Sequence, residues 1–439
     1  MTKIAWLTPF SRSSAIGQYS AIILEKLAAM AEVTIFASDL EDRAQAWLPD
    51  SDLRLLKRER SATIEAALAA SDVAIYNLGN YYPYHGIIWD YSRRFPGICI
   101  LHDLVMHPFF IDYYVYNQHN NAGYLREITY AHGEAGRILG EKVVRGEIDP
   151  MFFWSSATLL DYSMAKAALR GAEGAVVHSA YALGRLTEFS GFPVKHIPFP
   201  TPTIAHHPLA KSPPPQPRET VKLLTYGMIN PNKCVDQVIE AIGTSGILRA
   251  QISYDVVGKL EPTYERLLRA GIDKYNLREH VTLHGYQPDE TLYQMMADAD
   301  VIINLRNPHY GESSWSLLEA AFFGRTTVVW KHGYYDEFPD DTVVKVNSLD
   351  TLRDGLEKLV VDTPDRYRRA ERLRTYAEST FVTERYCDEL LSFIERIRRQ
   401  RPLLGLADFA AEQLYLLGAA NDPSAVRRVA DEIDRLRPS

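Results

Sequence analysis

The stretch "HHPLAKSPPPQPRET" (residues 206–220) separates two parts of the chain that repeat the same pattern. Proline clusters in this stretch and apolar periodicity stops, which is typical of a linker. On both sides of it, short apolar runs alternate with helical patterns. The runs before it include "KIAWLTP", "VTIFAS", "DVAIYNLG", "GICILHD" and "GAVVHS", and those after it include "KLLTYG", "SYDVVGK", "HVTLHGY", "DVIINLR", "TVVWKH" and "TVVKV". The chain therefore divides into two similar domains.

Apolar runs separated by helices predict parallel strands in sheets that are covered on both faces. We therefore predict an α/β protein with two doubly wound, Rossmann-like domains that face a cleft, followed by a helical C-terminal tail. The predicted ranges are 1–205 for the first domain, 206–220 for the linker, 221–385 for the second domain and 386–439 for the tail. Such sheets bind ligands at the carboxyl ends of their strands, so the cleft is the expected active site.

Composition narrows the class of function. The 439 residues carry a formal net charge of -8, and no stretch concentrates Lys and Arg with interleaved aromatics, so we expect no nucleic-acid partner. The three cysteines, Cys99, Cys234 and Cys387, are widely spaced, which favours a reducing compartment and a cytoplasmic location. The N-terminus lacks the pattern of a signal peptide, and no apolar run is long enough to span a membrane. Peripheral contact with a membrane and assembly into a homo-oligomer stay open.

Two segments each allow two interpretations. The aromatic runs "HPFFIDYYVYNQ" and "DPMFFWSSATLLDY" could form a satellite core or an oligomer contact, or they could form an acceptor surface because aromatic rings stack on sugars. The helical pattern over residues 363–439 could pack back across the first domain or contact a partner.

Two acids stand out in "PHYGESSWSLLEAAFFG" (residues 308–324). Glu312 and Glu319 are seven residues apart, and as helix positions they would lie on one face, about 10 Å apart along the axis. That spacing suits two groups of one extended ligand, and carboxylates accept hydrogen bonds from sugar hydroxyls. The alternative is that Glu312 caps a helix and Glu319 is solvated or ion-paired.

The start of the same helix favours an anion. Gly311 lets the backbone approach a ligand closely. The first free N–H groups, at Ser313, Ser314 and Trp315, together with the positive end of the helix dipole, would bind a diphosphate.

Two cations stand at predicted strand ends in the second domain. Lys233 follows the strand-to-helix loop in "LLTYGMINPNK", and Arg306 ends "DVIINLR". Both could balance phosphate charge at the edge where this fold binds ligands, although each taken alone is more often a surface charge.

The first domain offers candidates at its own strand ends. His102 and Asp103 follow the strand in "GICILHDLVMH", where they could act on a substrate or serve a structural role. Gly17 lies in "WLTPFSRSSAIGQYS", which is either a ligand-approaching loop or an ordinary strand-to-helix turn. The Asp-x-Asp pairs "DSD" (50–52) and "DAD" (298–300) are interpreted as solvated or capping acids. We predict no metal site.

The order of several motifs carries a family resemblance. "YGMINPNKCVDQVIEAI", "YDVVGK", "HVTLHGYQPDETLYQMMADADVIINLR" and "GESSWSLLEAAFFGRTTVV" together resemble the nucleotide-binding half of retaining glycosyltransferases of family four, which have the two-domain fold B. The similarity covers most of residues 221–346. It implies a nucleoside diphosphate sugar as donor substrate, transfer with retention, and no cofactor or bound metal.

The resemblance also implies roles for the candidate residues. It places Glu312, or the neighbouring backbone, on the donor sugar and Glu319 on the ribose, although their spacing is one residue shorter than the family's. Lys233 matches a phosphate-binding lysine, and Arg306 would replace an arginine that the family has where Met228 stands. The catalytic candidates are His102, Asp103 and Glu312, and the donor-binding candidates are Gly17, Lys233, Arg306, Gly311, Ser313, Ser314 and Glu319.

The expected function is therefore a retaining glycosyltransferase that acts on a hydroxyl of a glycan, lipid-linked or other acceptor. Two alternatives remain from the sequence. One is a nucleotide-sugar epimerase or a sugar phosphorylase on the same fold, and the other is a non-catalytic sugar-nucleotide binding or assembly protein.

Overall fold

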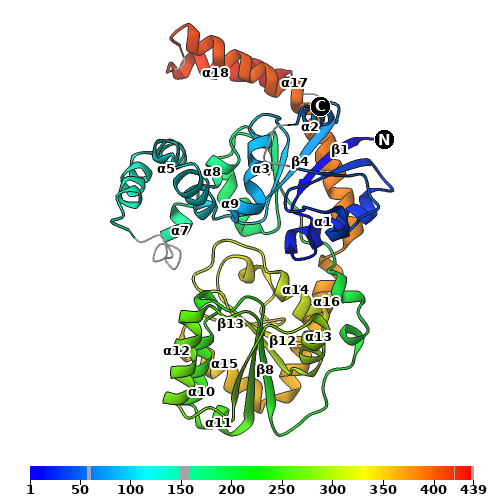
Figure 1. Ribbon diagram of the computed structural model, residues 1–439, viewed down its shortest axis with the longest axis vertical. Coiled ribbons are helices and arrows are strands. Elements are labelled where there is room, and N and C mark those ends of the chain that lie inside the picture. The colour runs from blue at the N-terminus through cyan, green and yellow to red at the C-terminus, as the bar shows by residue number, and fades with distance from the viewer. Residues whose placement is uncertain (57–60, 149–157, 420, 437–439) are drawn as a thin grey trace.

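The computed structural model describes residues 1–56, 61–148, 158–419 and 421–436. Two α/β domains stand one above the other, and the chain crosses from one to the other at the linker and again near residue 381 (Figure 1). Each domain has a parallel sheet with helices on both faces, as the alternating pattern predicts.

The first domain is built on a seven-stranded parallel sheet in the order β3-β2-β1-β4-β5-β6-β7. Its strands are β1 (Lys3–Thr8), β2 (Glu32–Ala37), β3 (Leu53–Leu55), β4 (Val73–Leu78), β5 (Ile98–Leu101), β6 (Gly174–Val177) and β7 (Val194–His196). The strand order reverses between β1 and β4, and every residue of β4 and β5 is buried. That reversal opens a crevice at the carboxyl ends of these strands.

Helices cover both faces of this sheet. They are α1 (Ala15–Leu27), α2 (Ala62–Ala69), α3 (Tyr82–Ser92), α4 (His107–Phe110), the π-helix η2 (Ile111–Asn117), α5 (Asn121–Val144), α7 (Thr158–Asp161), α8 (Ala165–Ala168) and α9 (Ala180–Thr187). In the first aromatic run, Phe109, Phe110 and Tyr113 pack edge-on around Trp89, with ring centroids 5.0 to 5.8 Å apart. These rings form core. Most of the second run, residues 149–157, lies outside the described residues.

The second domain has a six-stranded parallel sheet in the order β10-β9-β8-β11-β12-β13. Its strands are β8 (Val221–Tyr226), β9 (Ile252–Val257), β10 (Val281–Gly285), β11 (Val301–Asn304), β12 (Thr326–Trp330) and β13 (Val344–Val346). Its helices are α10 (Val235–Thr244), α11 (Gly246–Gln251), α12 (Pro262–Lys274), α13 (Asp289–Asp298), α14 (Trp315–Phe322), α15 (Leu349–Val361) and α16 (Thr363–Thr380). The order reverses between β8 and β11, which creates a second crevice.

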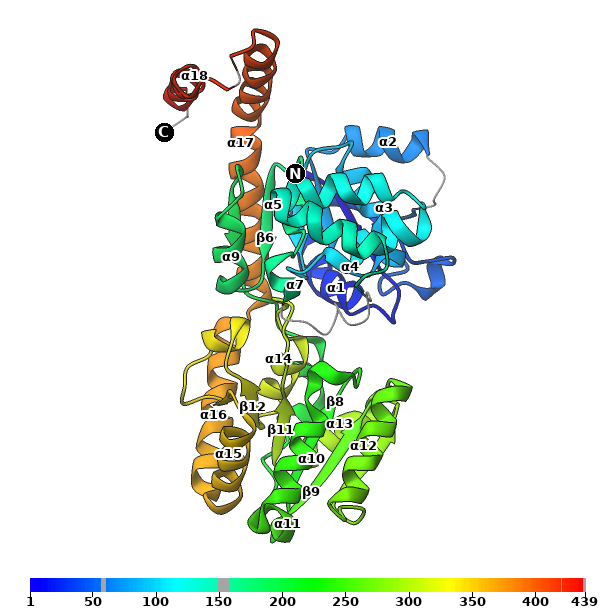
Figure 2. The same ribbon diagram turned by 90° about the vertical axis from the view of Figure 1, so that its left-hand side faces the viewer.

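The C-terminal helix α17 (Thr383–Leu416) runs back along the first domain (Figure 2). Its apolar side chains from Tyr386 to Ile397 belong to the core beneath α1. The hydroxyl groups of Tyr386 and Tyr19 are hydrogen-bonded, and Arg401 forms an ion pair with Glu173 at 2.7 Å. The sequence left open whether the tail packs across the first domain or contacts a partner. The first half of α17 packs across the first domain.

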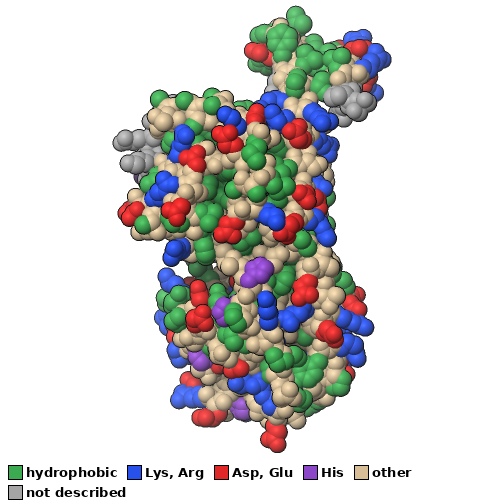
Figure 3. Space-filling view, turned by 90° about the vertical axis from the view of Figure 1, so that its right-hand side faces the viewer, with side chains coloured by type: hydrophobic (Ala, Val, Ile, Leu, Met, Phe, Trp, Pro, Cys, Tyr) green, Lys and Arg blue, Asp and Glu red, His purple; other side chains and the backbone are tan. Residues whose placement is uncertain are grey.

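The end of α17 and α18 (Pro423–Arg435) project beyond the body of the first domain (Figures 1 and 2). Figure 3 shows this projection at one end and a hollow at the level where the two domains meet. In the described part of the chain, no helix combines the length and apolar character that crossing a membrane requires.

Candidate active site

A cavity of about 500 Å³ lies between the two domains, at the carboxyl ends of both sheets. The predicted residues His102, Asp103, Lys233, Arg306, Glu312, Ser313, Ser314 and Glu319 all line it. It is also lined by Ala15, Ile16, Tyr19, Phe199, Tyr226, Gly227, Met228, Asn230, Asn232, Leu292, Trp315 and Ser316. The structure therefore brings candidates from both domains to one place.

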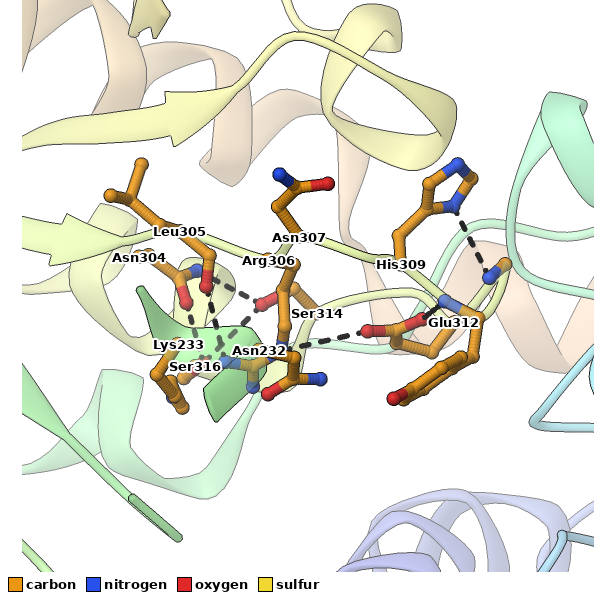
Figure 4. A network of polar contacts seen from close by, with 12 residues as sticks. Asn232, Lys233, Asn304, Leu305, Arg306, Asn307, His309, Glu312, Ser314 and Ser316 are labelled. Atoms are coloured by element: carbon orange, nitrogen blue, oxygen red, sulfur yellow. Dashed lines mark hydrogen bonds and ion pairs between the residues drawn. The ribbon is translucent and has the colours of Figure 1, made fainter. Parts of the chain in front are cut away.

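Two cations converge on the second-domain side of the cavity (Figure 4). Lys233 lies in the turn Pro231–Lys233 after β8, and its side chain is buried. Its Nζ donates a hydrogen bond to the carbonyl oxygen of Tyr226 at 2.8 Å. Burial and the nearby charge of Arg306 hold the pKa of Lys233 well below its ordinary value. A bound anion would relieve this penalty because it favours the charged amine.

Glu312 lies in the loop before α14, three residues ahead of the first helical residue Trp315. The expectation that Glu312 and Glu319 share one helix face is therefore wrong, because Ser314 and not Glu312 caps the helix. The Glu312 Oε2 accepts a hydrogen bond from the Tyr310 amide at 2.6 Å, and its Oε1 lies 3.5 Å from the Arg306 Nε. Burial raises the pKa of Glu312, and the charge of Arg306 opposes that rise.

The N-terminus of α14 is fixed by a buried polar network. The Ser314 Oγ accepts hydrogen bonds from the Leu317 amide at 3.2 Å and from Asn304 Nδ2 at 2.9 Å. Ser316 donates to the Asn304 Oδ1 at 3.2 Å. Asn304 ends β11, so the sheet itself holds the helix end at the cavity. The positive end of the helix dipole therefore opens on the cavity beside Lys233 and Arg306.

Glu319 lies in the second turn of α14 and reaches the same cavity. Burial raises its pKa to about 7, although Tyr226 and Lys233 oppose the shift. The Tyr226 hydroxyl donates to the Ser316 carbonyl oxygen at 2.6 Å, which fixes one wall beside the carboxyl group. Near neutral pH this group can therefore accept or donate a hydrogen bond.

His102 and Asp103 directly follow β5 on the opposite wall. His102 Nε2 donates a hydrogen bond to the Asn77 Oδ1 at 3.0 Å. The Asp103 Oδ2 accepts a hydrogen bond from the Asn80 amide at 2.9 Å. Burial, with a smaller contribution from the negative charge of Glu312, raises the pKa of Asp103 to about 6, while the hydrogen bond from the Asn80 amide opposes the rise.

The two candidate glycines pack the protein and do not line the cavity. Gly17 lies in the first turn of α1, where an added Cβ would come within 2.9 Å of the Ser11 carbonyl oxygen. Gly311 has a φ of +73°, and an added Cβ would come within 2.6 Å of the Leu104 Cβ in the other domain. Both glycines allow close approach, but to the protein's own chain.

The sequence reasoning missed several cavity residues. Asn230, Asn232 and Trp315 each hold a buried polar atom, Oδ1 or Nε1, that has no hydrogen-bond partner among the described residues. Asn230 and Asn232 belong to the loop after β8, so the strand-end rule could have found them. Tyr19 and Phe199 reach the cavity from distant segments, and no local pattern indicates that.

The Asp-x-Asp pairs have structural partners. For Asp300 the interpretation as a solvated or capping acid is wrong, because its side chain is buried and ion-paired. Asp300 accepts hydrogen bonds from the Arg218 side chain at 3.0 Å and from the Lys222 amide at 2.8 Å, so it fixes the linker. Asp52 accepts from the Thr34 hydroxyl at 2.8 Å. Among the described residues, no group of three or more His, Cys, Asp or Glu side chains is arranged to hold a metal ion.

Comparison with known proteins places this site in a family. Residues 210–380 match the family Glycosyl transferases group 1. No curated protein matches the chain. Among solved structures, the chain is similar to the sucrose-phosphate synthase of Thermosynechococcus elongatus, with 16% identity over 90% of this chain and 99% of that chain and a TM-score of 0.60.

Two other solved structures share the fold. Anabaena Alr3699/HepE in complex with UDP-glucose is 15% identical over 90% of this chain and all of that chain, with a TM-score of 0.60. WaaG, a glycosyltransferase involved in lipopolysaccharide biosynthesis, is 16% identical over 88% of this chain and 98% of that chain, with a TM-score of 0.57. Residues 210–380, which make up most of the second domain, therefore match the glycosyl transferases group 1 family, and the chain as a whole has the two-domain glycosyltransferase fold B.

Proposed function

We propose that the protein is a retaining glycosyltransferase that moves a sugar from a nucleoside diphosphate sugar to an acceptor hydroxyl. One observation carries this proposal: Lys233, Arg306 and the N-terminus of α14 converge on one side of a cavity that Glu312 and Glu319 also line. Cations and a helix N-terminus suit a diphosphate, and carboxylates suit sugar hydroxyls.

The donor diphosphate lies between Lys233 and the α14 amides in this scheme. The cations stabilise the negative charge that grows on the leaving diphosphate, which is the main electrostatic task of the transfer. Glu312 accepts hydrogen bonds from the donor sugar, and Glu319 accepts from the ribose. The unpartnered Trp315 Nε1 is a further hydrogen-bond donor at this wall.

The first domain contributes the wall on which the reacting sugar and the acceptor meet. The acceptor oxygen attacks the anomeric carbon from the face that the diphosphate leaves, and the bond between that carbon and the diphosphate oxygen breaks. The acceptor proton passes to the leaving phosphate oxygen, so charge and atoms balance. His102 and Asp103 orient the sugar from this side.

The acceptor in this proposal is a hydroxyl of a glycan, a lipid-linked sugar or another small molecule. The product separates this proposal from its alternatives. A transferase gives a new glycoside, an epimerase gives an isomerised nucleotide sugar, and a phosphorylase gives a sugar phosphate. A protein that only binds the nucleotide sugar gives none of these and releases no nucleoside diphosphate.

A donor panel tests the proposal. UDP-glucose comes first because a HepE structure of the same fold holds it. We expect one nucleotide sugar to raise the melting temperature most, and the same donor to release nucleoside diphosphate and give a glycoside with the anomeric configuration retained, seen by proton NMR. Glu312→Ala and Lys233→Ala should abolish transfer while the fold survives. An inverted product, or wild-type turnover in both variants, would refute the proposal.

A further inference from the structure

Asn77 lies at the centre of a hydrogen-bond chain behind the cavity. It is the fifth residue of β4, and its side chain is fully buried. Its Nδ2 donates to the Leu7 carbonyl oxygen at 3.1 Å, and its Oδ1 accepts from His102 Nε2 at 3.0 Å. Its main-chain oxygen accepts from His85 Nδ1 at 3.0 Å. Every polar group of the Asn77 side chain is therefore directed at a specific neighbour.

The chemistry of these partners fixes the orientation of the amide. A backbone carbonyl oxygen can only accept, so the amide nitrogen of Asn77 must face Leu7. The amide oxygen then faces His102, and because this oxygen also only accepts, the hydrogen must reside on His102 Nε2.

The surroundings keep the His102 ring neutral. Burial lowers its pKa well below the ordinary value, and the neighbouring rings of His178 and His85 lower it further. The Tyr19 ring packs edge-on at 4.8 Å, and the His178 ring lies at 5.3 Å. In a neutral ring with the hydrogen on Nε2, Nδ1 carries a lone pair.

We propose that Asn77 is a positioning residue that holds His102 as the neutral, Nε2-protonated tautomer, so that Nδ1 accepts a hydrogen bond from a hydroxyl of the bound sugar. A lone pair attracts a hydroxyl hydrogen and repels a phosphate oxygen. This wall of the cavity therefore selects the sugar part of the donor, whereas the cations opposite select the diphosphate. The ligand identity rests on the proposed function; the tautomer does not.

Asn77→Asp tests the proposal with almost no change in volume. A carboxylate in place of the amide favours the doubly protonated His102 ring, because an opposite charge stabilises the imidazolium. Nδ1 then becomes a donor and no longer accepts from a hydroxyl. We expect kcat to fall by roughly 10²-fold, in the range of a lost acid–base or orienting group.

The direct readout is the ¹⁵N spectrum of histidine-labelled protein at pH 7, with the His102 signal assigned by comparison with His102→Gln. We expect a neutral Nε2–H ring in the wild type and an imidazolium in Asn77→Asp. The titratable groups that face this ring are His178, His85 and Tyr19, so both proteins are measured under the same conditions.

Two outcomes would overturn the proposal. One is a wild-type His102 that is imidazolium or carries its hydrogen on Nδ1, which can be observed even if the variant fails to fold. The other is an Asn77→Asp protein that loses kcat while His102 stays neutral with the hydrogen on Nε2, since Asn77 would then act through packing alone. Failure of the proposed function looks different: no nucleotide sugar is turned over, whatever the tautomer.

Discussion

The backbone amide of Val105 donates a hydrogen bond to the carbonyl oxygen of Tyr310 at 3.1 Å, and so joins the two domains directly. Val105 follows the loop that carries His102 and Asp103. The amide of Tyr310 in turn donates to the Glu312 carboxylate at 2.6 Å. This backbone contact therefore links the two loops that carry candidate catalytic groups of the two domains.

Gly311→Ala should disturb this junction. The new methyl group would stand 2.6 Å from the Leu104 Cβ, which leaves no room for both atoms, so the Glu312 loop must move away from the first domain. A displacement of about 1 Å at a reacting centre costs roughly 10²-fold in rate. We expect kcat to fall by about that factor, measured as donor turnover, with a smaller effect on the affinity for nucleoside diphosphate.

Gly146→Ala is the matched control for this variant. Gly146 has a φ of +72°, close to that of Gly311, but no atom of the described residues lies within 4 Å of its added Cβ. Both substitutions therefore strain the backbone equally, and only one meets the other domain. An equal loss of kcat in both variants would show that strain, and not the contact between domains, is responsible.

Lys233→Met should separate binding from folding. Methionine has nearly the same length as lysine but no charge. The charge of Lys233 is unfavourable when the side chain is buried and no anion is bound. We expect the melting temperature without ligand to change little. The shift that the best nucleotide-sugar donor of the panel induces should disappear, with affinity lower by about 10²-fold. Lys331→Met changes an exposed lysine of the same domain and should keep the full shift. A normal shift in Lys233→Met would remove Lys233 from the donor site.

Glu319 should make stability depend on pH. Its pKa rises from 4.5 to about 7 in the folded protein, so the protonated form favours folding. That contribution is complete below pH 4.5 and is lost as the pH rises through 7. A shift of this size corresponds to roughly 3 kcal/mol, and because the Glu319 side chain is only half-buried we expect a contribution on the order of 2 kcal/mol.

Melting temperatures at pH 5 and pH 8 check this prediction. Glu319→Gln should be no more stable than the wild type at pH 5 and more stable at pH 8, since Gln never carries the buried charge. Glu279→Gln, at an exposed position of the same domain, should show no such difference. A Glu319→Gln curve parallel to the wild type across this range contradicts the assignment.

Two truncations test the role of α17. Removing residues 383–439 deletes the whole helix, exposes the first-domain core around α1 and leaves the buried Tyr19 hydroxyl without its partner. We expect loss of soluble, cooperatively melting protein. Removing only residues 403–439 keeps the ion pair between Arg401 and Glu173 and the core contacts. This shorter chain should melt within a few degrees of the full chain. If both truncated proteins were equally stable, α17 would not be needed to complete the first-domain core.

Local pattern accounts for most of the fold. Continuous apolar runs with helices between them predict buried parallel strands, and the proline cluster marks the junction between domains. The rule that ligands bind at strand carboxyl ends predicts one shared site for the residues that follow these strands. In the structure, one cavity is lined by His102, Asp103, Lys233 and Arg306. Their proposed roles in binding and catalysis stay predictions.

The prediction that Glu312 and Glu319 lie on one helix face was wrong. Ser314 caps α14, so the helix begins after Glu312. The local sequence around Gly17 and Gly311 predicts room for a ligand. In the structure, Ser11 and Leu104 fill the space beside these glycines. Whether a glycine faces a ligand or another segment depends on what packs against it, and periodicity carries no information about that.

The sequence by itself determined the two α/β domains and the strand-end cations, because these follow from residue pattern within short windows. Only the tertiary structure decided that α17 completes the first domain, that Asn77 bonds to His102, and that Val105 meets Tyr310. These contacts join residues far apart in the chain. Their geometry is set by the packing of whole elements, since a hydrogen bond or a close contact tolerates only a few tenths of an ångström.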